Sequence, residues 1–193
     1  LFRSAGSITM MGRTSAADWY GILVYNGGTT IKAGGDITIS GVSATGGTGW
    51  ATYIAGTVWS TAGNISITGT GSSGVFLSNV AGIGGVIAGN TTTGPTSGGT
   101  ITINATGTSS GRYGLQNNAA PVVAFDQITV TATAVGNHAF IMNGTGAKVQ
   151  SASDVTINAT QGTWGLTMYD NSFIQSTKAN SLSTGNVSIT ASG

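Results

Sequence analysis

The sequence predicts an all-β fold, a right-handed parallel β-helix in which a three-sided coil of roughly 27–30 residues repeats about six times. Three observations indicate this fold. A short segment of alternating apolar and polar residues recurs seven times, two further apolar segments lie between most copies, and Gly, Asn and Ser fill the corners. No stretch has the i, i+3, i+4 apolar spacing of an amphipathic helix over three turns.

The first recurring segment is a strand with one buried and one exposed face. In one copy, Ile101 and Ile103 alternate with Thr102 and Asn104, which is the period of a half-buried strand. We expect the apolar positions to stack into one continuous core, because no single coil could bury them alone. The seven copies begin at Ile8, Ile37, Ile65, Ile101, Ile128, Val155 and Val187.

The second and third segments complete each coil. The second segment spans 20–25, 50–55, 74–79, 113–118, 138–143 and 164–169. The third segment comes six residues before most copies of the first, at Phe2, Ile31, Trp59, Val122 and Val149, and similar apolar pairs occur at 86–87 and 173–174. This spacing predicts that Trp59 points into the core.

The repeat covers the whole chain, so we expect residues 1–193 to form a single β-helix segment of a longer repeat protein. Both ends fall in mid-coil, and an open solenoid edge invites pairing with another chain. Insertions at 90–99 and 178–185 lengthen two of the intervals. Solenoid insertions often cluster on a binding face, so these loops are candidate contact regions, with passive decoration as the alternative.

Composition excludes several classes of function. Six Lys and Arg against five Asp give a net charge of +1, and the cations are far apart in the sequence, so we expect no nucleic acid or anionic lipid partner. No run of 18 apolar residues exists, so we expect no helical membrane insertion. The absence of Cys excludes disulfides, thiol nucleophiles and Cys-type zinc sites.

The segment Y-G-I-L-V-Y-N-G-G-T-T-I-K-A-G-G-D-I-T-I-S-G at 20–41 resembles the repeat of filamentous haemagglutinin-type adhesins, the large exoproteins of two-partner secretion systems. All six coils share the pattern. The resemblance implies a right-handed β-helix, export through an outer-membrane transporter, and attachment to cells, matrix or other bacteria.

A polysaccharide lyase or hydrolase on this fold would need clustered acids with Arg or Lys, or bound calcium. The acids do not converge: Asp36 and Asp154 share a corner position where Asp usually caps backbone N–H groups, and Asp18 and Asp170 belong to coils one and six. His138, the only histidine, occupies an aromatic position and is expected to be a stacked residue. We therefore expect no catalytic residue, no metal site and no cofactor.

Four aromatic residues share the position that opens the second segment: Tyr20, Trp50, Tyr113 and Trp164. If they face solvent they form a strip that could stack on sugar rings, and if they turn inward they form a packing ladder with offset or edge contacts. The inward ladder is the favoured interpretation, because Ser73 interrupts the strip.

The outward positions of the first segment form columns of hydroxyl residues. This array resembles the Thr-X-Thr face of solenoid antifreeze proteins, although Thr is an ordinary exposed strand residue and Asn replaces it twice. The threonines of this possible surface ladder are Thr38, Thr68, Thr102, Thr129, Thr131, Thr156 and Thr190.

These observations predict a non-enzymatic, secreted segment of a bacterial surface adhesin, which projects from the cell and contacts glycans or proteins on host or bacterial surfaces. A self-assembling filament subunit, with coils docked end to end, is the structural alternative. Ice binding through the hydroxyl array is the further alternative.

Overall fold

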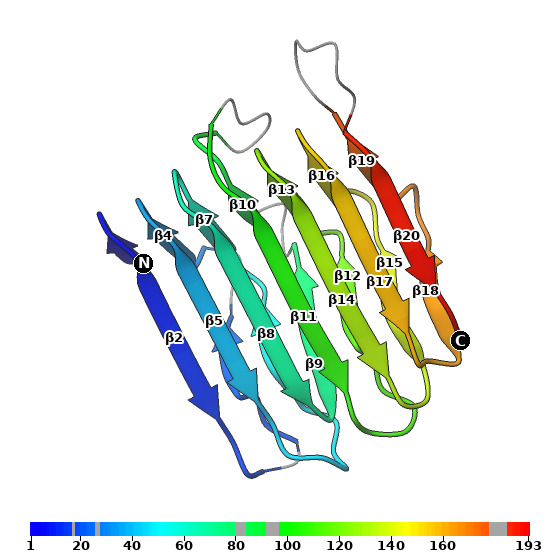
Figure 1. Cartoon of the computed structure of the whole chain (residues 1–193). Helices are drawn as coiled ribbons and strands as arrows, with labels where there is room; N and C mark the ends of the chain where they lie inside the picture. The colour runs from blue at the N-terminus through cyan, green and yellow to red at the C-terminus, as the bar shows by residue number, and fades with distance from the viewer. Residues whose placement is uncertain (17, 26–27, 80–83, 92–96, 178–184) are drawn as a thin grey trace.

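The computed structural model shows an all-β parallel solenoid and describes residues 1–16, 18–25, 28–79, 84–91, 97–177 and 185–193. Three parallel sheets, of seven, seven and six strands, surround one core in about six turns (Figure 1). The predicted three-sided architecture is therefore confirmed. Within the described ranges there is no helix, and none of those ranges contains a helical segment long and apolar enough to cross a bilayer.

The recurring first segment forms the first sheet, and the second and third segments form the second and third sheets. The first sheet contains β2 (Ile8–Arg13), β5 (Ile37–Val42), β8 (Ile65–Gly71), β11 (Ile101–Gly107), β14 (Ile128–Ala134), β17 (Val155–Thr160) and β20 (Val187–Ala191). The second sheet contains β3 (Ile22–Val24), β6 (Trp50–Ile54), β9 (Ser73–Ser78), β12 (Leu115–Asn118), β15 (His138–Asn143) and β18 (Trp164–Met168). The third sheet contains β1 (Phe2–Ser4), β4 (Thr30–Ala33), β7 (Thr57–Ser60), β10 (Gly85–Ala88), β13 (Pro121–Ala124), β16 (Lys148–Ser151) and β19 (Phe173–Ser176).

Equivalent residues of successive coils pair directly, so each side chain lies above its counterpart. Ile103 of β11, for example, pairs with Ile67 of β8 on one side and with Val130 of β14 on the other. All three are fully buried. The alternation of Ile or Val with Thr, Ser or Asn thus places one apolar column after another inside the solenoid, as the period of two predicts.

In the first sheet, a small residue comes after the inward Ile or Val, at the corner between the first and second sheets. Gly41 and Gly69 pair with each other, and Ala105 takes the same position in the next coil. A Cβ on Gly41 would overlap the carbonyl oxygen of Ala51 on β6, and a Cβ on Gly69 would overlap the carbonyl oxygen of Gly74. The first and second sheets therefore approach so closely at this corner that some coils accept only glycine.

Side-chain caps connect successive coils at the corner that precedes the first sheet. The carboxylate Oδ1 of Asp36 accepts a hydrogen bond from the backbone N–H of Asn64 at 2.8 Å, and Oδ1 of Asp154 accepts one from the N–H of Asn186 at 2.7 Å. Asn64 repeats the arrangement toward the N–H of Thr100 at 2.9 Å. The predicted capping role of Asp36 and Asp154 is confirmed, because each satisfies a corner donor that no strand pairs.

The predicted inward position of Trp59 is wrong. Val58 is the residue that pairs with Ile31 and fills the core, whereas Trp59 pairs with Lys32 on the outer face and is partly exposed. Four residues (61–64) separate β7 from β8, but only three (34–36) separate β4 from β5. The longer corner shifts the offset by one residue, and a shift of one residue exchanges the two faces of a strand.

The two insertions proposed as contact regions, 90–99 and 178–185, fall largely on residues 92–96 and 178–184, which lie outside the described residues. At the start of the first insertion, the Asn90 N–H donates a hydrogen bond to the carbonyl of Ser97 at 2.9 Å. The described ends of this loop therefore lie close together.

Candidate functional site

The outer face of the second sheet carries two columns of side chains that include six of the fourteen Phe, Tyr and Trp residues of the chain. The strand register aligns equivalent positions, because Ile22 pairs with Thr52, Val75 with Leu115, and Leu115 with Phe140. The corner column consists of Tyr20, Trp50, Ser73, Tyr113, His138 and Trp164. The central column consists of Leu23, Tyr53, Phe76, Gln116, Ile141 and Thr167.

Ring contacts join both columns into one continuous surface. Tyr53 and Phe76 stack with ring centroids 4.6 Å apart, and Phe76 contacts Trp50 at 5.1 Å. Tyr20 meets Tyr53 edge-on at 5.2 Å, and Tyr25, directly after β3, approaches Tyr53 at 6.5 Å. We call this surface the aromatic belt; it comprises Tyr20, Tyr25, Trp50, Tyr53, Phe76, Tyr113, His138 and Trp164.

Ser73 does not interrupt the belt. Trp50 and Tyr113 lie two coils apart, which corresponds to about 9.6 Å of rise at 4.8 Å per strand. Their ring centroids are nevertheless 6.0 Å apart and their planes differ by 5°. Both rings lean over the small Ser73 side chain, which is buried beneath them. A small residue in the column thus permits stacking between coils that are not adjacent.

The favoured interpretation that the aromatic column turns inward is wrong, because its rings are partly or largely exposed on the outer face. The expected ladder of ring contacts is nevertheless present on that face. Trp164 is 55% exposed and Tyr25 is 68% exposed, while the rings between them are partly buried by their neighbours. In the stacked stretch from Trp50 to Trp164, the inner rings of Tyr113 and His138 each stack between two other rings and are partly exposed. Open ring faces therefore occur mainly at Tyr25 and Trp164.

Sequence reasoning identified Tyr20, Trp50, Tyr113 and Trp164 but missed the central column. Tyr53 and Phe76 stand three residues after the corner position and occur in only two coils. The available signal was their shared offset of three residues from the corner position, since Val75, Phe76 and Leu77 form a continuous apolar run without alternation. Burial raises the pKa of the Tyr53 hydroxyl, and the adjacent phenols of Tyr20 and Tyr25 raise it further.

His138 is a stacked belt residue, as predicted. Its ring lies 5.9 Å from that of Tyr113 and 4.7 Å from that of Trp164, with interplanar angles of 12° and 22°. Its Nδ1 lies 2.7 Å from the hydroxyl oxygen of Thr167 in the neighbouring coil. Burial between the two rings lowers the pKa of the imidazole, which favours the neutral form.

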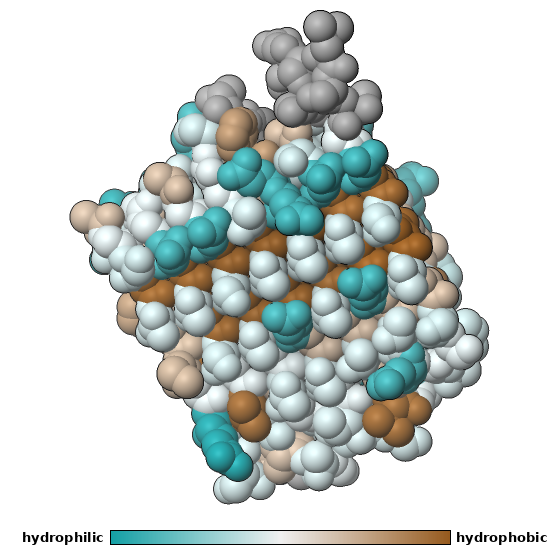
Figure 2. Space-filling model, in the orientation of Figure 1, coloured by the Kyte–Doolittle hydropathy of each residue, from teal (hydrophilic) through white to brown (hydrophobic). Residues whose placement is uncertain are grey.

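The outer face of the first sheet carries the predicted hydroxyl ladder. Thr102, Thr129 and Thr156 are paired in one column, and Thr68, Asn104 and Thr131 are paired in the next. Thr38 and Thr190 extend these columns at opposite ends of the sheet. Figure 2 shows this face as parallel rows of pale, weakly hydrophilic residues with isolated strongly hydrophilic ones.

A third hydroxyl column, which sequence reasoning missed, runs beside these two. It contains Thr70, Thr106, Thr133 and Thr160, and the hydroxyls of Thr133 and Thr106 are 3.5 Å apart. The array is interrupted on β2, where Met11 and Arg13 occupy the equivalent outward positions. It is therefore most regular across β8, β11, β14 and β17.

Four of the five carboxylates, those of Asp18, Asp36, Asp154 and Asp170, accept hydrogen bonds from backbone N–H groups. Asp18 accepts hydrogen bonds from the backbone N–H and the hydroxyl of Thr48, and both bonds lower the pKa of its carboxyl. Asp170 accepts a bond from the N–H of Gly144 at 3.1 Å. Across the part of the chain that the structure describes, no three His, Cys, Asp or Glu side chains come together as a metal site.

Comparison with known proteins adds no relative to this description: no family model, no curated protein and no solved structure matches the chain.

Proposed function

We propose that this chain is a segment of an extracellular bacterial surface adhesin, of the filamentous haemagglutinin type that its repeat resembles, and that the aromatic belt is its contact surface. The observation that carries the proposal is the belt itself, a continuous set of aromatic rings held in register on the outside of a rod. Trp and Tyr are enriched at contact surfaces because they combine large apolar faces with a polar group.

The architecture suits a projecting role. Each coil is hydrogen-bonded to the next along three parallel sheets, and a single apolar core runs through all of them. Because every coil contacts only its neighbours, such a rod is lengthened by adding coils without a change in its cross-section. A surface repeated along its side could hold a ligand through many weak contacts, whose combined strength exceeds that of each one.

The contacts would be made by the exposed ring faces and by the polar groups beside them. Tyr25 and Trp164 present open faces at the two ends of the belt, and the hydroxyls of Tyr20 and Tyr53 lie between. Pyranose rings have one apolar face and equatorial hydroxyls, so neutral cell-surface glycans match this combination. We therefore propose glycans as the first class of ligand to test.

The test is attachment of beads that carry the chain to cultured epithelial cells and to an array of neutral glycans. The double variant Tyr25→Ser/Trp164→Ser should show at least a roughly tenfold loss of binding to the cells and to the array, because both open ring faces are lost. Phe173→Ser, which removes an exposed aromatic from the third sheet, is the matched control and should bind as the original chain does. Beads that attach no better than albumin-coated beads would contradict the proposal.

Ice binding is the second candidate, and the in-register hydroxyl columns of the first sheet favour it. A regular flat array could order water along two directions, the strand axis and the solenoid axis. Thr102→Lys should abolish thermal hysteresis, whereas Thr57→Lys on the third sheet should leave it unchanged. A solution of the original chain without thermal hysteresis would exclude this candidate.

A further inference from the structure

Three of the five tyrosines of the chain gather in its first two coils. Tyr20 and Tyr25 flank β3 in the first coil, and Tyr53 lies on β6 in the second. The ring centroid of Tyr53 is 5.2 Å from that of Tyr20 and 6.5 Å from that of Tyr25. We call these three residues the phenol cluster. Phenols are among the most easily oxidised side chains, so this cluster places oxidisable groups of two coils next to one another.

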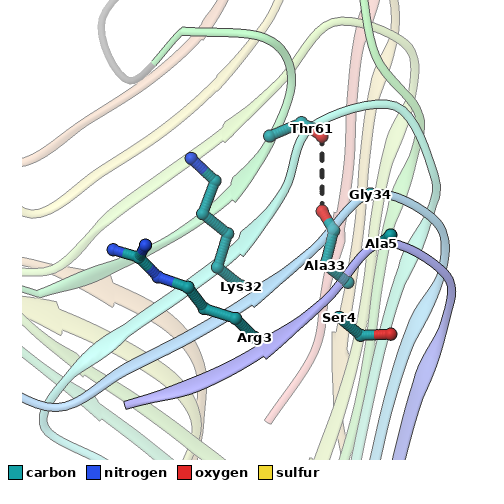
Figure 3. A pocket seen from close by; sticks show the side chains of 7 residues that line it. All are labelled: Arg3, Ser4, Ala5, Lys32, Ala33, Gly34 and Thr61. Atoms are coloured by element: carbon teal, nitrogen blue, oxygen red, sulfur yellow. Dashed lines mark hydrogen bonds between the residues drawn. The ribbon is translucent and has the colours of Figure 1, made fainter.

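The phenol cluster is reached directly from solvent. The ring of Tyr25 is 68% exposed, and those of Tyr20 and Tyr53 are partly exposed. A groove of about 390 Å³ lies on the third sheet instead, where the side chains of Arg3 and Lys32 project from neighbouring strands (Figure 3). None of the seven residues that line this groove is a tyrosine. An oxidant therefore meets the phenols on the outer face of the second sheet.

Tyr53 is the fixed member of the cluster. Its ring stacks on that of Phe76, with centroids 4.6 Å apart and planes inclined by 24°, and the ring of Tyr20 meets it edge-on. Burial and the two adjacent phenols raise the pKa of its hydroxyl. At neutral pH the group is therefore an intact phenol, which loses a proton together with an electron when it is oxidised. A radical formed on Tyr53 is a neutral phenoxyl held in one place.

Tyr25 is the member that can move to meet it. Tyr25 directly follows β3 and its ring lies mostly in solvent, so rotation about its side-chain bonds displaces no core residue. Its plane is inclined by 41° to that of Tyr53, and the two rings of a biaryl are likewise twisted relative to each other. The plane of Tyr20 is inclined by 73°, so that an edge meets a face and the two ring edges do not face each other. Tyr25 is therefore better placed than Tyr20 to couple with Tyr53.

We propose that Tyr25 and Tyr53 form a dityrosine cross-link when the chain meets hydrogen peroxide and a haem peroxidase. Each phenol loses one electron and one proton, and together these reduce one molecule of peroxide to two molecules of water. The two phenoxyl radicals join through a carbon–carbon bond between the ring carbons beside their hydroxyl groups. Each of these carbons then loses its hydrogen as a proton and each phenol oxygen regains one, so the product has two hydrogen atoms fewer than the two tyrosines.

The cross-link would join the first coil to the second covalently. Strands β3 and β6 pair directly, with Leu23 opposite Tyr53. A covalent link between residues distant in sequence restricts the unfolded chain, as a disulfide does, and this sequence contains no Cys. The chemistry depends only on the phenol cluster. Its setting, an extracellular chain that meets peroxide, rests on the proposed function.

The test treats a dilute solution of the intact chain with hydrogen peroxide and a haem peroxidase. Dityrosine fluorescence, the mass of the monomer and the linked peptides are then measured. Tyr25→Phe and Tyr53→Phe each keep a ring but remove one phenol, and both should lose the dityrosine fluorescence of the monomer. Tyr20→Phe should retain it. Tyr113→Phe is the matched control, because Tyr113 is a phenol of the aromatic belt that stacks between an indole and an imidazole.

We expect a monomer that is lighter by two hydrogen atoms and a pair of linked peptides that contain Tyr25 and Tyr53. The yield in Tyr113→Phe should match that of the original chain. A link between Tyr53 and Tyr20, dityrosine found only in covalent dimers, the absence of any linked monomer, or an equal loss in Tyr113→Phe would overturn the proposal. The experiment measures no attachment to cells or glycans, so its failure is distinguishable from failure of the proposed function.

Discussion

Trp50 and Tyr113 stack almost parallel, at 6.0 Å, although a complete coil lies between them. The rings can meet because the intervening coil has Ser73 at the same position, and this serine is only 1% exposed beneath them. The aromatic surface is therefore continuous, although Ser73 interrupts the row of aromatic residues in the sequence. It also leaves the hydroxyl of Ser73 buried without a hydrogen-bond partner.

That unpaired hydroxyl leads to the first prediction. Ser73→Ala should leave the free energy of unfolding unchanged or raise it by about 1 kcal/mol, because a buried polar atom without a partner is removed. Ser60→Ala is the matched control, since Ser60 is equally buried but donates to the carbonyl of Gly35 and accepts from the N–H of Gly63. This control should lose about 1–3 kcal/mol. Urea unfolding of both variants checks the difference, and a larger loss for Ser73→Ala would contradict it.

The second prediction concerns the stacked core. Ile103 is fully buried between Ile67 and Val130, so Ile103→Ala should lower the free energy of unfolding by about 2–5 kcal/mol. The neighbouring Thr102 points outward, and Thr102→Ala should stay within about 0.5 kcal/mol of the original chain. Thermal melts followed by circular dichroism measure both. Equal melting temperatures for the two variants would show that the inward assignment is wrong.

The third prediction tests the close approach of the first and second sheets. Gly41→Ala should destabilise the chain by about 1–3 kcal/mol, because the new methyl group overlaps the carbonyl oxygen of Ala51. Gly6→Ala is the control, since the nearest atom to its added Cβ is the Ser4 hydroxyl oxygen at 3.9 Å. Unfolding midpoints in urea compare the two. A midpoint for Gly41→Ala equal to that of Gly6→Ala would mean that the sheets are further apart than the structure has them.

The fourth prediction is a pH dependence that comes from His138. Burial lowers the pKa of its imidazole in the folded chain below the ordinary value of 6.5. The unfolded chain then binds the proton more readily, so the contribution of His138 is complete above pH 6.5 and declines as the pH falls through the folded-state pKa. His138→Phe keeps a ring in the stack and should melt with less pH dependence between about pH 7.5 and 5.5. An unchanged pH dependence in this variant would assign the effect to other groups.

The sequence was sufficient to predict the three sheets, because the alternation of apolar and polar residues repeats at a period that only a solenoid coil satisfies. It failed at Trp59, where one extra corner residue moved the side chain to the outer face. The sequence does not indicate clearly how many residues a corner contains. Each added corner residue nevertheless exchanges the inward and outward positions inferred for the strand before it. The same reasoning placed Asp36 and Asp154 correctly, because their role depends only on the position at the corner.

The aromatic surface was only partly predictable. Membership of the corner column follows from the period, and Tyr20, Trp50, Tyr113 and Trp164 were found in this way. Trp50 and Tyr113 meet across Ser73 because of their side-chain rotamers and the space that the small serine leaves between them. The repeat period gives no information about either. The neighbouring positions of Arg3 and Lys32 follow from the register predicted for Phe2 and Ile31, but the basic residues were considered only by their separation in the sequence.

The most direct test of the proposed contact surface uses the four tryptophans as reporters. A nitrogen–proton NMR spectrum shows one indole N–H signal for each of Trp19, Trp50, Trp59 and Trp164. The ligand is the neutral oligosaccharide that binds most tightly on the array. We predict a large shift for Trp164, whose open face ends the belt. We predict no shift for Trp59, which lies on the third sheet and whose indole N–H donates to the carbonyl of Gly89. Four unchanged signals at saturating ligand, or a shift confined to Trp59, would contradict the assignment of the aromatic belt as the contact surface.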